Sequence, residues 1–174
     1  PALLAVLAKN GWNSKDAPVY VQSFEVANLK ALRKQSSVRL VQLLSSSGRP
    51  YDFAAAGNTQ TYADMATAAG LKEIATYADV VGAHKDLVIP VKDGALGTPT
   101  ALVKDAHALN LAVHIWTLRP ENAFLPAAYK KAPTTDNTVR GDSVGEIQVF
   151  LKAGVDGFFT DDSGVGRLAV DSLK

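Results

Sequence analysis

The sequence predicts an α/β fold built on a parallel β-sheet. Short runs rich in branched and aromatic apolar residues alternate along the chain with segments that have the apolar spacing of helices. The turns between them are mostly short, and strict alternation of this kind is typical of parallel strands joined by right-handed crossovers. Two architectures fit the pattern, an open doubly wound sheet and part of a (β/α)8 barrel.

The length of the chain bears on the second architecture. A complete barrel takes about 250 residues, whereas this chain has 174. As a barrel, it would carry about five βα units and lack about three. No repeat and no linker is visible, so a single domain over residues 1–174 is expected, and the start at Pro1 suggests a processed or incompletely covered chain.

Five strands are expected, each from a short apolar run bounded by polar or turn residues. The first is opened by Pro18, and the fourth is a run of small and branched residues that ends in a tryptophan followed by charge. A strand covered on both faces needs no polar residue until it leaves the sheet. The expected strands are residues 17–24, 37–46, 79–83, 111–118 and 156–161.

Helix boundaries are predicted from capping residues. Asn10 and Gly11 end the first helix, because this pair favours a left-handed exit, and Gly154 ends a later one. Thr98 and Pro99 open a helix, as an N-cap followed by proline at the first helical position. Ser143 with Glu146 predicts a capping box. The expected helices are residues 1–10, 25–35, 62–69, 71–78, 98–109, 143–153 and 163–174.

Composition excludes several classes of partner. The 18 lysines and arginines nearly balance the 17 aspartates and glutamates, and neither sign forms a long run, so no nucleic acid partner is expected. No apolar run reaches about 18 residues, so no transmembrane segment is expected. Cysteine is absent, which removes disulfides, thiolate metal sites and cysteine nucleophiles.

One glycine motif stands near the carboxyl end. Gly164, Gly166 and Ala169 match the dinucleotide fingerprint G-x-G-x-x-A between a strand and a helix. That fingerprint belongs in the first βα turn of its domain, with an acidic residue about 20 positions on. Here it follows the last strand, so we expect a helix start with tight packing rather than a nucleotide site.

The three histidines have no metal-ligand spacing between them. His107 is expected on a helix surface, and His114 shares a strand face with Trp116, either as a core histidine or as part of a lining. His84 follows a short strand at its carboxyl end, where sites of parallel α/β folds are usually built. Asp161 ends the last strand, and we expect it to cap the following helix rather than to serve a site.

Three further side chains end strands at the same rim. Gln22 is an amide that needs a partner if it is buried, Phe24 follows it, and Trp116 could either wall a pocket or plug the core. No nucleophile elbow, Walker loop, H-E-x-x-H motif or calcium loop is present. From the residues alone, the chain predicts a pocket rim but no reaction.

Three stretches together resemble the glycerophosphodiester phosphodiesterase family, and the order and spacing agree from about Pro1 to Asp162. The Glu-Asn-x-Phe-Leu-Pro extension in the second stretch, with VQLL and KDLVIP elsewhere, resembles the longer secreted or periplasmic branch. The stretches are VYVQSFEVANLKALRK (19–34), LAVHIWTLRPENAFLP (111–126) and GEIQVFLKAGVDGFFTDD (145–162).

The resemblance implies a (β/α)8 TIM barrel of which this chain carries strands 4 to 8. It implies metal-dependent hydrolysis of glycerophosphodiesters to an alcohol and sn-glycerol 3-phosphate by the full-length parent. The divalent cation, calcium or magnesium, has its ligands upstream of this chain, as do the catalytic histidines. No catalytic or metal-binding residue is therefore assigned here, and the 174 residues alone are expected to be inactive.

The resemblance also implies that this half walls the glycerol and headgroup side of the site. The expected substrate-binding residues are Gln22, Phe24, Lys85 and Trp116, while His84 stands where many relatives carry proline. The alternative is a non-catalytic TIM-barrel relative that acts as a ligand-binding or structural module. The sequence does not predict an oligomeric state.

Overall fold

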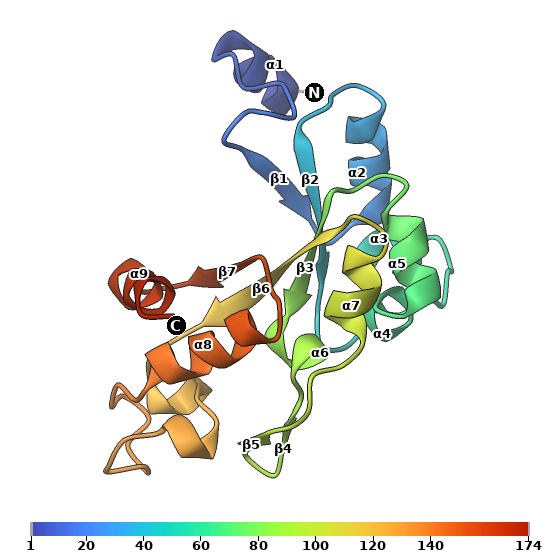
Figure 1. The fold of residues 1–174 in the computed structure, drawn as a ribbon. Helices are drawn as coiled ribbons and strands as arrows, with labels where there is room; N and C mark the ends of the chain where they lie inside the picture. The colour runs from blue at the N-terminus through green and yellow to red at the C-terminus, as the bar shows by residue number, and fades with distance from the viewer. Residues whose placement is uncertain (1, 174) are drawn as a thin grey trace. The chain divides into compact units, whose positions relative to one another are not determined.

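The computed structural model describes residues 2–173 and has five strands in one sheet, in the order β1, β2, β3, β6, β7 (Figure 1). The two pairs whose registers are defined, β1 with β2 and β6 with β7, are parallel, as predicted. Each strand lies inside its expected range, except that β3 extends one residue beyond it, to His84. The strands are β1 (Tyr20–Ser23), β2 (Arg39–Leu44), β3 (Val80–His84), β6 (Ala112–Leu118) and β7 (Gly157–Thr160).

The described chain divides into two compact units. The first comprises residues 2–82 and 104–112, and the second comprises residues 83–103 and 113–173. In the first unit, helices precede or follow the paired strands β1 and β2. They are α1 (Ala2–Lys9), α2 (Val26–Arg33), α3 (Tyr51–Ala55), α4 (Tyr62–Met65) and α5 (Ala68–Ile74).

β2 forms the centre of the first unit because its side chains are buried from Leu40 to Leu44. The buried polar side chain in this strand is Gln42. Its amide nitrogen donates to the Phe24 carbonyl at 2.9 Å, and its oxygen accepts from the Tyr77 hydroxyl at 2.9 Å. Since both polar ends have partners, the amide is tolerated in the core, and burial raises the pKa of Tyr77.

α3 lies in the glycine-, proline- and serine-containing segment between the strand expected at residues 37–46 and the helix expected at residues 62–69, for which the sequence predicts a loop. The short helix brings the carboxylate of Asp52 to the start of α2, where it accepts a hydrogen bond of 2.7 Å from the backbone nitrogen of Ala27. Helix amino termini leave such donors unsatisfied within the helix. The loop prediction was wrong here because the partner of Asp52 lies 25 positions away.

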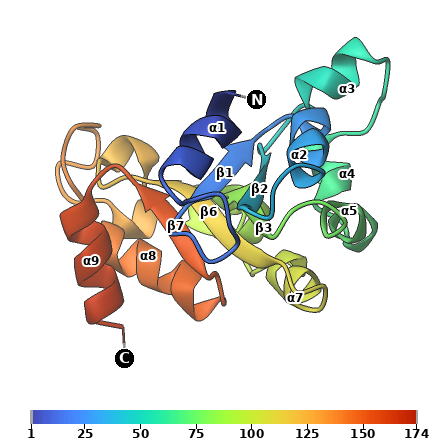
Figure 2. The ribbon, with the colours of Figure 1, turned by 90° about the horizontal axis from the view of Figure 1, so that it is seen from above.

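The second unit contains the segments that follow β3, β6 and β7. Its helices α8 and α9 lie side by side (Figure 2). α7 begins in this unit and starts at Leu102, later than Thr98 and Pro99 predict. The elements are α6 (Lys85–Val88), β4 (Val91–Lys92), β5 (Ala95–Leu96), α7 (Leu102–His107), the 3-10 turns η1 (Asn122–Phe124) and η2 (Ala127–Tyr129), α8 (Ser143–Lys152) and α9 (Ser163–Asp171).

The caps of α8 and α9 differ from the predicted ones by one residue each. Asp142, not Ser143, caps α8, with its Oδ1 accepting from the Gly145 nitrogen at 2.9 Å. Asp162, not Asp161, caps α9, with its Oδ1 accepting from the Val165 nitrogen at 2.9 Å. In both cases the neighbouring residue has a suitable side chain, and the backbone turn decides which of the two is used.

The glycine motif in α9 serves packing. A Cβ on Gly166 would lie 2.9 Å from the Thr160 Cγ2 and 3.1 Å from the Phe158 Cε2 on β7. Glycine therefore lets α9 approach the strand closely. The expectation of a tightly packed helix start is confirmed.

Candidate functional site

β6 presents two different faces in the second unit. Val113 and Ile115 are fully buried on one face, whereas His114 and Trp116 are partly exposed on the other. The prediction that His114 and Trp116 share a face is confirmed. The His84 ring packs edge to face against Trp116, with 5.0 Å between ring centroids, and His114 packs against Phe159 at 6.4 Å.

His84 is placed by the end of β3 as the first residue of this aromatic face. Its Nδ1 accepts a hydrogen bond of 3.3 Å from the Asp86 nitrogen, so Nδ1 is unprotonated in this arrangement. Burial lowers the pKa of His84, while the nearby Asp86 carboxylate opposes the shift and Lys85 adds to it. The imidazole is therefore neutral at pH 7, with its proton on Nε2.

Lys85, the next residue, is buried with 8% of its surface exposed. Its Nζ lies 2.7 Å from the Oε1 of Glu146 on α8 and donates to the Phe124 carbonyl at 2.9 Å. Burial raises the pKa of Glu146, and Lys85 opposes that shift. The Glu146 side chain is thus paired with Lys85 and does not close the predicted capping box.

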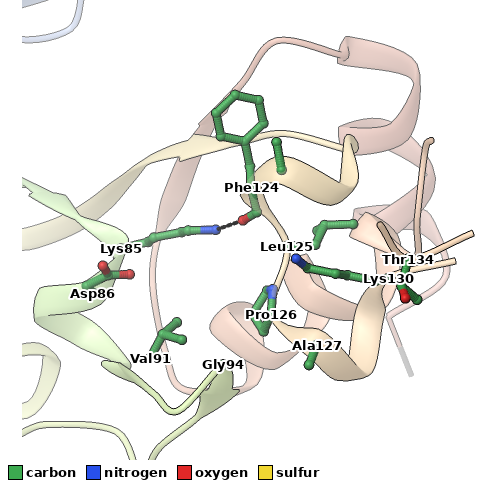
Figure 3. A pocket seen from close by; sticks show the side chains of 11 residues that line it. Lys85, Asp86, Val91, Gly94, Phe124, Leu125, Pro126, Ala127, Lys130 and Thr134 are labelled. Carbon is green, nitrogen blue, oxygen red and sulfur yellow. Dashed lines mark hydrogen bonds between the residues drawn. The ribbon is translucent and has the colours of Figure 1, made fainter. Parts of the chain in front are cut away.

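A pocket of about 470 Å³ opens beside Lys85 in the second unit (Figure 3). Lys85 and Asp86 approach it from α6, and Lys130 approaches from the segment after η2. Much of the remaining wall is apolar. The lining residues are Lys85, Asp86, Val91, Gly94, Ala123, Phe124, Leu125, Pro126, Ala127, Lys130 and Thr134.

The pocket wall formed by η1 and η2 is held by the buried side chain of Asn122. Its Nδ2 donates to the carbonyls of Lys131 at 2.8 Å and Asp136 at 3.1 Å, and its Oδ1 accepts from the Lys131 nitrogen at 3.0 Å. The long loop after β6 is therefore organised from within. The sequence assigns no role to Asn122, although an asparagine directly before the apolar run of residues 123–126 was the available signal.

The hairpin formed by β4 and β5 contacts the same wall at η2. β4 and β5 are joined by Asp93 and Gly94, which have φ values of 52° and 77°. Two successive left-handed residues are typical of the tight turns that match strand twist. The Ala127 nitrogen donates to the Gly94 carbonyl at 2.7 Å, so the hairpin tip is fixed to η2.

Two of the four predicted substrate contacts, Gln22 and Phe24, belong to the first unit. Gln22 is exposed, and the buried, fully paired amide of this unit is Gln42 instead. The difference arises because β1 lies at the end of the strand order, whereas β2 has a strand on each side. Phe24 is 39% exposed and packs edge to face against Tyr62 at 6.0 Å.

The other two, Lys85 and Trp116, belong to the second unit. His84 links them, because it precedes Lys85 in the chain and its ring packs against Trp116. A substrate-binding role for each of the four residues stays a prediction. For Lys85 the structure adds a second role, because its ammonium joins α6 to η1 and to α8.

Asp161 takes part in a different interaction from the predicted cap. Its Oδ2 lies 2.6 Å from the Nε of Arg119, as an ion pair without hydrogen-bond alignment. The Arg119 guanidinium also lies over the Phe124 ring, 4.7 Å from its centroid. His107 is exposed on α7, as predicted.

Residues 2–173 contain no group of three histidine, aspartate or glutamate side chains arranged to hold a metal ion. The described side chains therefore do not fit a metal site. The search for membrane spans over the same residues finds no helix with the length and apolar character to cross a bilayer.

Comparison with known proteins shows the family that this chain resembles. The model of the glycerophosphoryl diester phosphodiesterase family matches residues 2–165. Glycerophosphodiester phosphodiesterase GDPD6 of Arabidopsis thaliana is 32% identical over 148 residues, which cover 84% of this chain and 36% of that protein.

Two crystal structures described as glycerophosphoryl diester phosphodiesterases share the fold. The Silicibacter pomeroyi DSS-3 protein matches with a TM-score of 0.58 and 20% identity over 98% of this chain and 43% of its own. The Agrobacterium tumefaciens C58 protein matches with a TM-score of 0.50 and 17% identity over 97% of this chain and 49% of its own. The chain thus spans less than half the length of these relatives, and its fold is consistent with part of a (β/α)8 barrel.

Proposed function

Because this chain belongs to the glycerophosphoryl diester phosphodiesterase family, we propose that the full-length protein containing it hydrolyses glycerophosphodiesters. The net reaction breaks the bond between phosphorus and the headgroup oxygen. The hydroxyl of water is added to phosphorus, and its proton goes to the alcohol, which leaves sn-glycerol 3-phosphate. The observation that carries the proposal is the family match over residues 2–165.

We propose that these residues are strands 4 to 8 of the barrel and form the wall of the site rather than its reacting groups. The partly exposed aromatic face with Trp116 and His84 supports this assignment, because such surfaces line ligand pockets. Gln22 in β1 and Phe24 directly after it are exposed and would contribute in the same way.

The hydrolysis would depend on a divalent cation, calcium or magnesium, that neutralises charge on the phosphodiester. Its ligands would lie outside the described residues, since these offer no suitable cluster. We further propose that the protein is secreted or periplasmic, on the resemblance of the Glu121–Pro126 extension to that branch of the family.

The test is hydrolysis by the purified full-length protein. Incubated with glycerophosphocholine and calcium or magnesium, it should release choline and sn-glycerol 3-phosphate, and chelation with EDTA should stop the release. Residues 1–174 expressed alone serve as the control and should be inactive. Absence of turnover by the full-length protein with every divalent metal would contradict the proposal, and substrate binding without turnover would favour a non-catalytic relative.

A further inference from the structure

We infer that the pocket between α6, the β4–β5 hairpin and the η1–η2 segment binds the headgroup of the substrate and favours one that carries both an ammonium and a carboxylate, as in glycerophosphoserine. This inference rests on the proposed function, and it narrows the substrate class.

The position of the pocket suits a leaving headgroup. Lys85 and Asp86 follow directly on the carboxyl end of β3, and Phe124 to Ala127 lie in the segment that follows β6. Sites of parallel α/β folds are built at this end of the strands. The volume of about 470 Å³ lies within the range of small-molecule sites and exceeds what a headgroup of a few heavy atoms requires.

The positive side of the pocket is formed by two lysines. The Lys85 ammonium has three N–H groups, and among the described residues two of them are used, by Glu146 and by the Phe124 carbonyl. The third is left for a ligand. Figure 3 shows Lys130 directing its ammonium toward Pro126 and the pocket, and no ion pair of Lys130 is present among residues 2–173. A ligand carboxylate would be attracted by both cations.

The negative side is the carboxylate of Asp86, which enters from α6 beside Lys85, on the other side of the pocket from Lys130 (Figure 3). Among the described residues, the side chain that would form an ion pair with it is His84, whose Nδ1 lies 3.7 Å from the Asp86 Oδ2. That nitrogen accepts the hydrogen bond from the Asp86 amide, so the imidazole is neutral and does not compensate the carboxylate. An ammonium of the ligand would complete the pair.

The same wall disfavours a quaternary ammonium. Such groups are usually held against aromatic faces, and Phe124 is the single aromatic residue among the described lining residues. Its ring is occupied by Arg119 and points away from Lys85 and Pro126 (Figure 3). A choline headgroup would therefore bury its methyl groups without aromatic rings around them, and it has no N–H group to donate to Asp86.

The experiment compares kcat/KM of the full-length protein for three substrates with serine, ethanolamine and choline headgroups. We expect glycerophosphoserine to be the best substrate and glycerophosphocholine the poorest. The value of kcat/KM should fall about tenfold for each charge-assisted hydrogen bond that a headgroup cannot make. Lys130→Met should reduce the preference for serine over ethanolamine about tenfold, because only serine has the carboxylate. Asp86→Asn should reduce the preference for ethanolamine over choline.

Lys131→Met is the matched control, because its side chain is exposed and does not line the pocket. It should leave the order of the three substrates unchanged. Equal kcat/KM for the three headgroups, or equal losses for all three in Lys130→Met, would overturn the pocket assignment while the proposed function stands. If no substrate is hydrolysed, the proposed function fails, and calorimetric titration with glycerophosphoserine then decides the pocket by the loss of binding in Lys130→Met.

Discussion

The Nζ of Lys85 lies 2.7 Å from the Oε1 of Glu146, and this ion pair is buried in the second unit. The lysine follows β3 and the glutamate lies in α8, 61 positions further on. A buried pair costs desolvation, which its mutual attraction only partly offsets, but removal of one partner leaves a charge without compensation. The pair therefore fixes which segments pack together more than it adds to stability.

The first prediction follows from that pair. Lys85→Met should lower the free energy of unfolding by about 3 kcal/mol, because it leaves the Glu146 carboxylate buried alone. Urea unfolding of the full-length protein measures the change. The double variant Lys85→Met with Glu146→Leu should recover most of the loss, and a double variant as unstable as the sum of the two single ones would show that the two residues are not coupled.

The second prediction concerns the cap of α9 and its dependence on pH. Its hydrogen bond from the Val165 nitrogen, assisted by Arg140, lowers the pKa of Asp162 below its ordinary 3.8. Because the folded-state pKa is the lower one, the carboxylate contributes stability that is fully present above pH 3.8 and is lost as the pH falls through the folded-state pKa.

Asp162→Ala should accordingly lower the melting temperature at pH 7 and flatten its decline in acid. Asp161→Ala is the matched control, since that side chain pairs with Arg119 at the surface and caps nothing. Melting curves from pH 2.5 to 7 by circular dichroism provide the measurement. A larger loss at pH 7 in Asp161→Ala than in Asp162→Ala would contradict the assigned cap.

The third prediction concerns the loop after β6. Asn122→Ala removes the hydrogen bonds that this buried amide makes to the backbone carbonyls of Lys131 and Asp136. We expect the free energy of unfolding to fall by about 2 kcal/mol, because two hydrogen bonds of about 1 kcal/mol each are lost. Hydrogen exchange of residues 129–139 should accelerate. Asn137 is an exposed residue of the same loop, and in Asn137→Ala the exchange should stay as in the wild type. Equal acceleration in both variants would show that the hydrogen bonds of Asn122 do not hold the loop.

The fourth prediction concerns Trp116 and depends on the proposed function. Trp116→Leu removes the aromatic wall against which His84 packs and should raise the KM for glycerophosphodiesters about tenfold. Steady-state kinetics of the full-length protein test this. Trp12→Leu is the control, because Trp12 is an exposed residue of the first unit. Unchanged KM in Trp116→Leu would remove this residue from the substrate wall.

All five strands could be predicted from the sequence because each is a contiguous apolar run, and the packing role of Gly166 could be predicted from its place in the chain. The partners of polar side chains could not. Gln22 and Gln42 both stand in apolar strands, but the register of β1 with β2 puts them on opposite faces of the sheet, and β2 also has a strand on each side.

The same reason applies to Glu146, whose spacing from Ser143 suits a capping box but whose actual partner is far away in the chain. The hairpin at Asp93 and Gly94 carried a local signal, yet its flanking strands have only two residues each. In runs of two residues, an alternation of apolar and polar side chains cannot be recognised. Sequence patterns therefore locate this rim but do not specify the contacts within it.

The hydrogen bond from the Ala127 nitrogen to the Gly94 carbonyl has a mechanical consequence. It couples the turn of the hairpin to the far side of the pocket, so any displacement of one transmits to the other. A substitution at Asp93, which does not line the pocket, would then alter the affinity for a bound molecule that this residue does not contact.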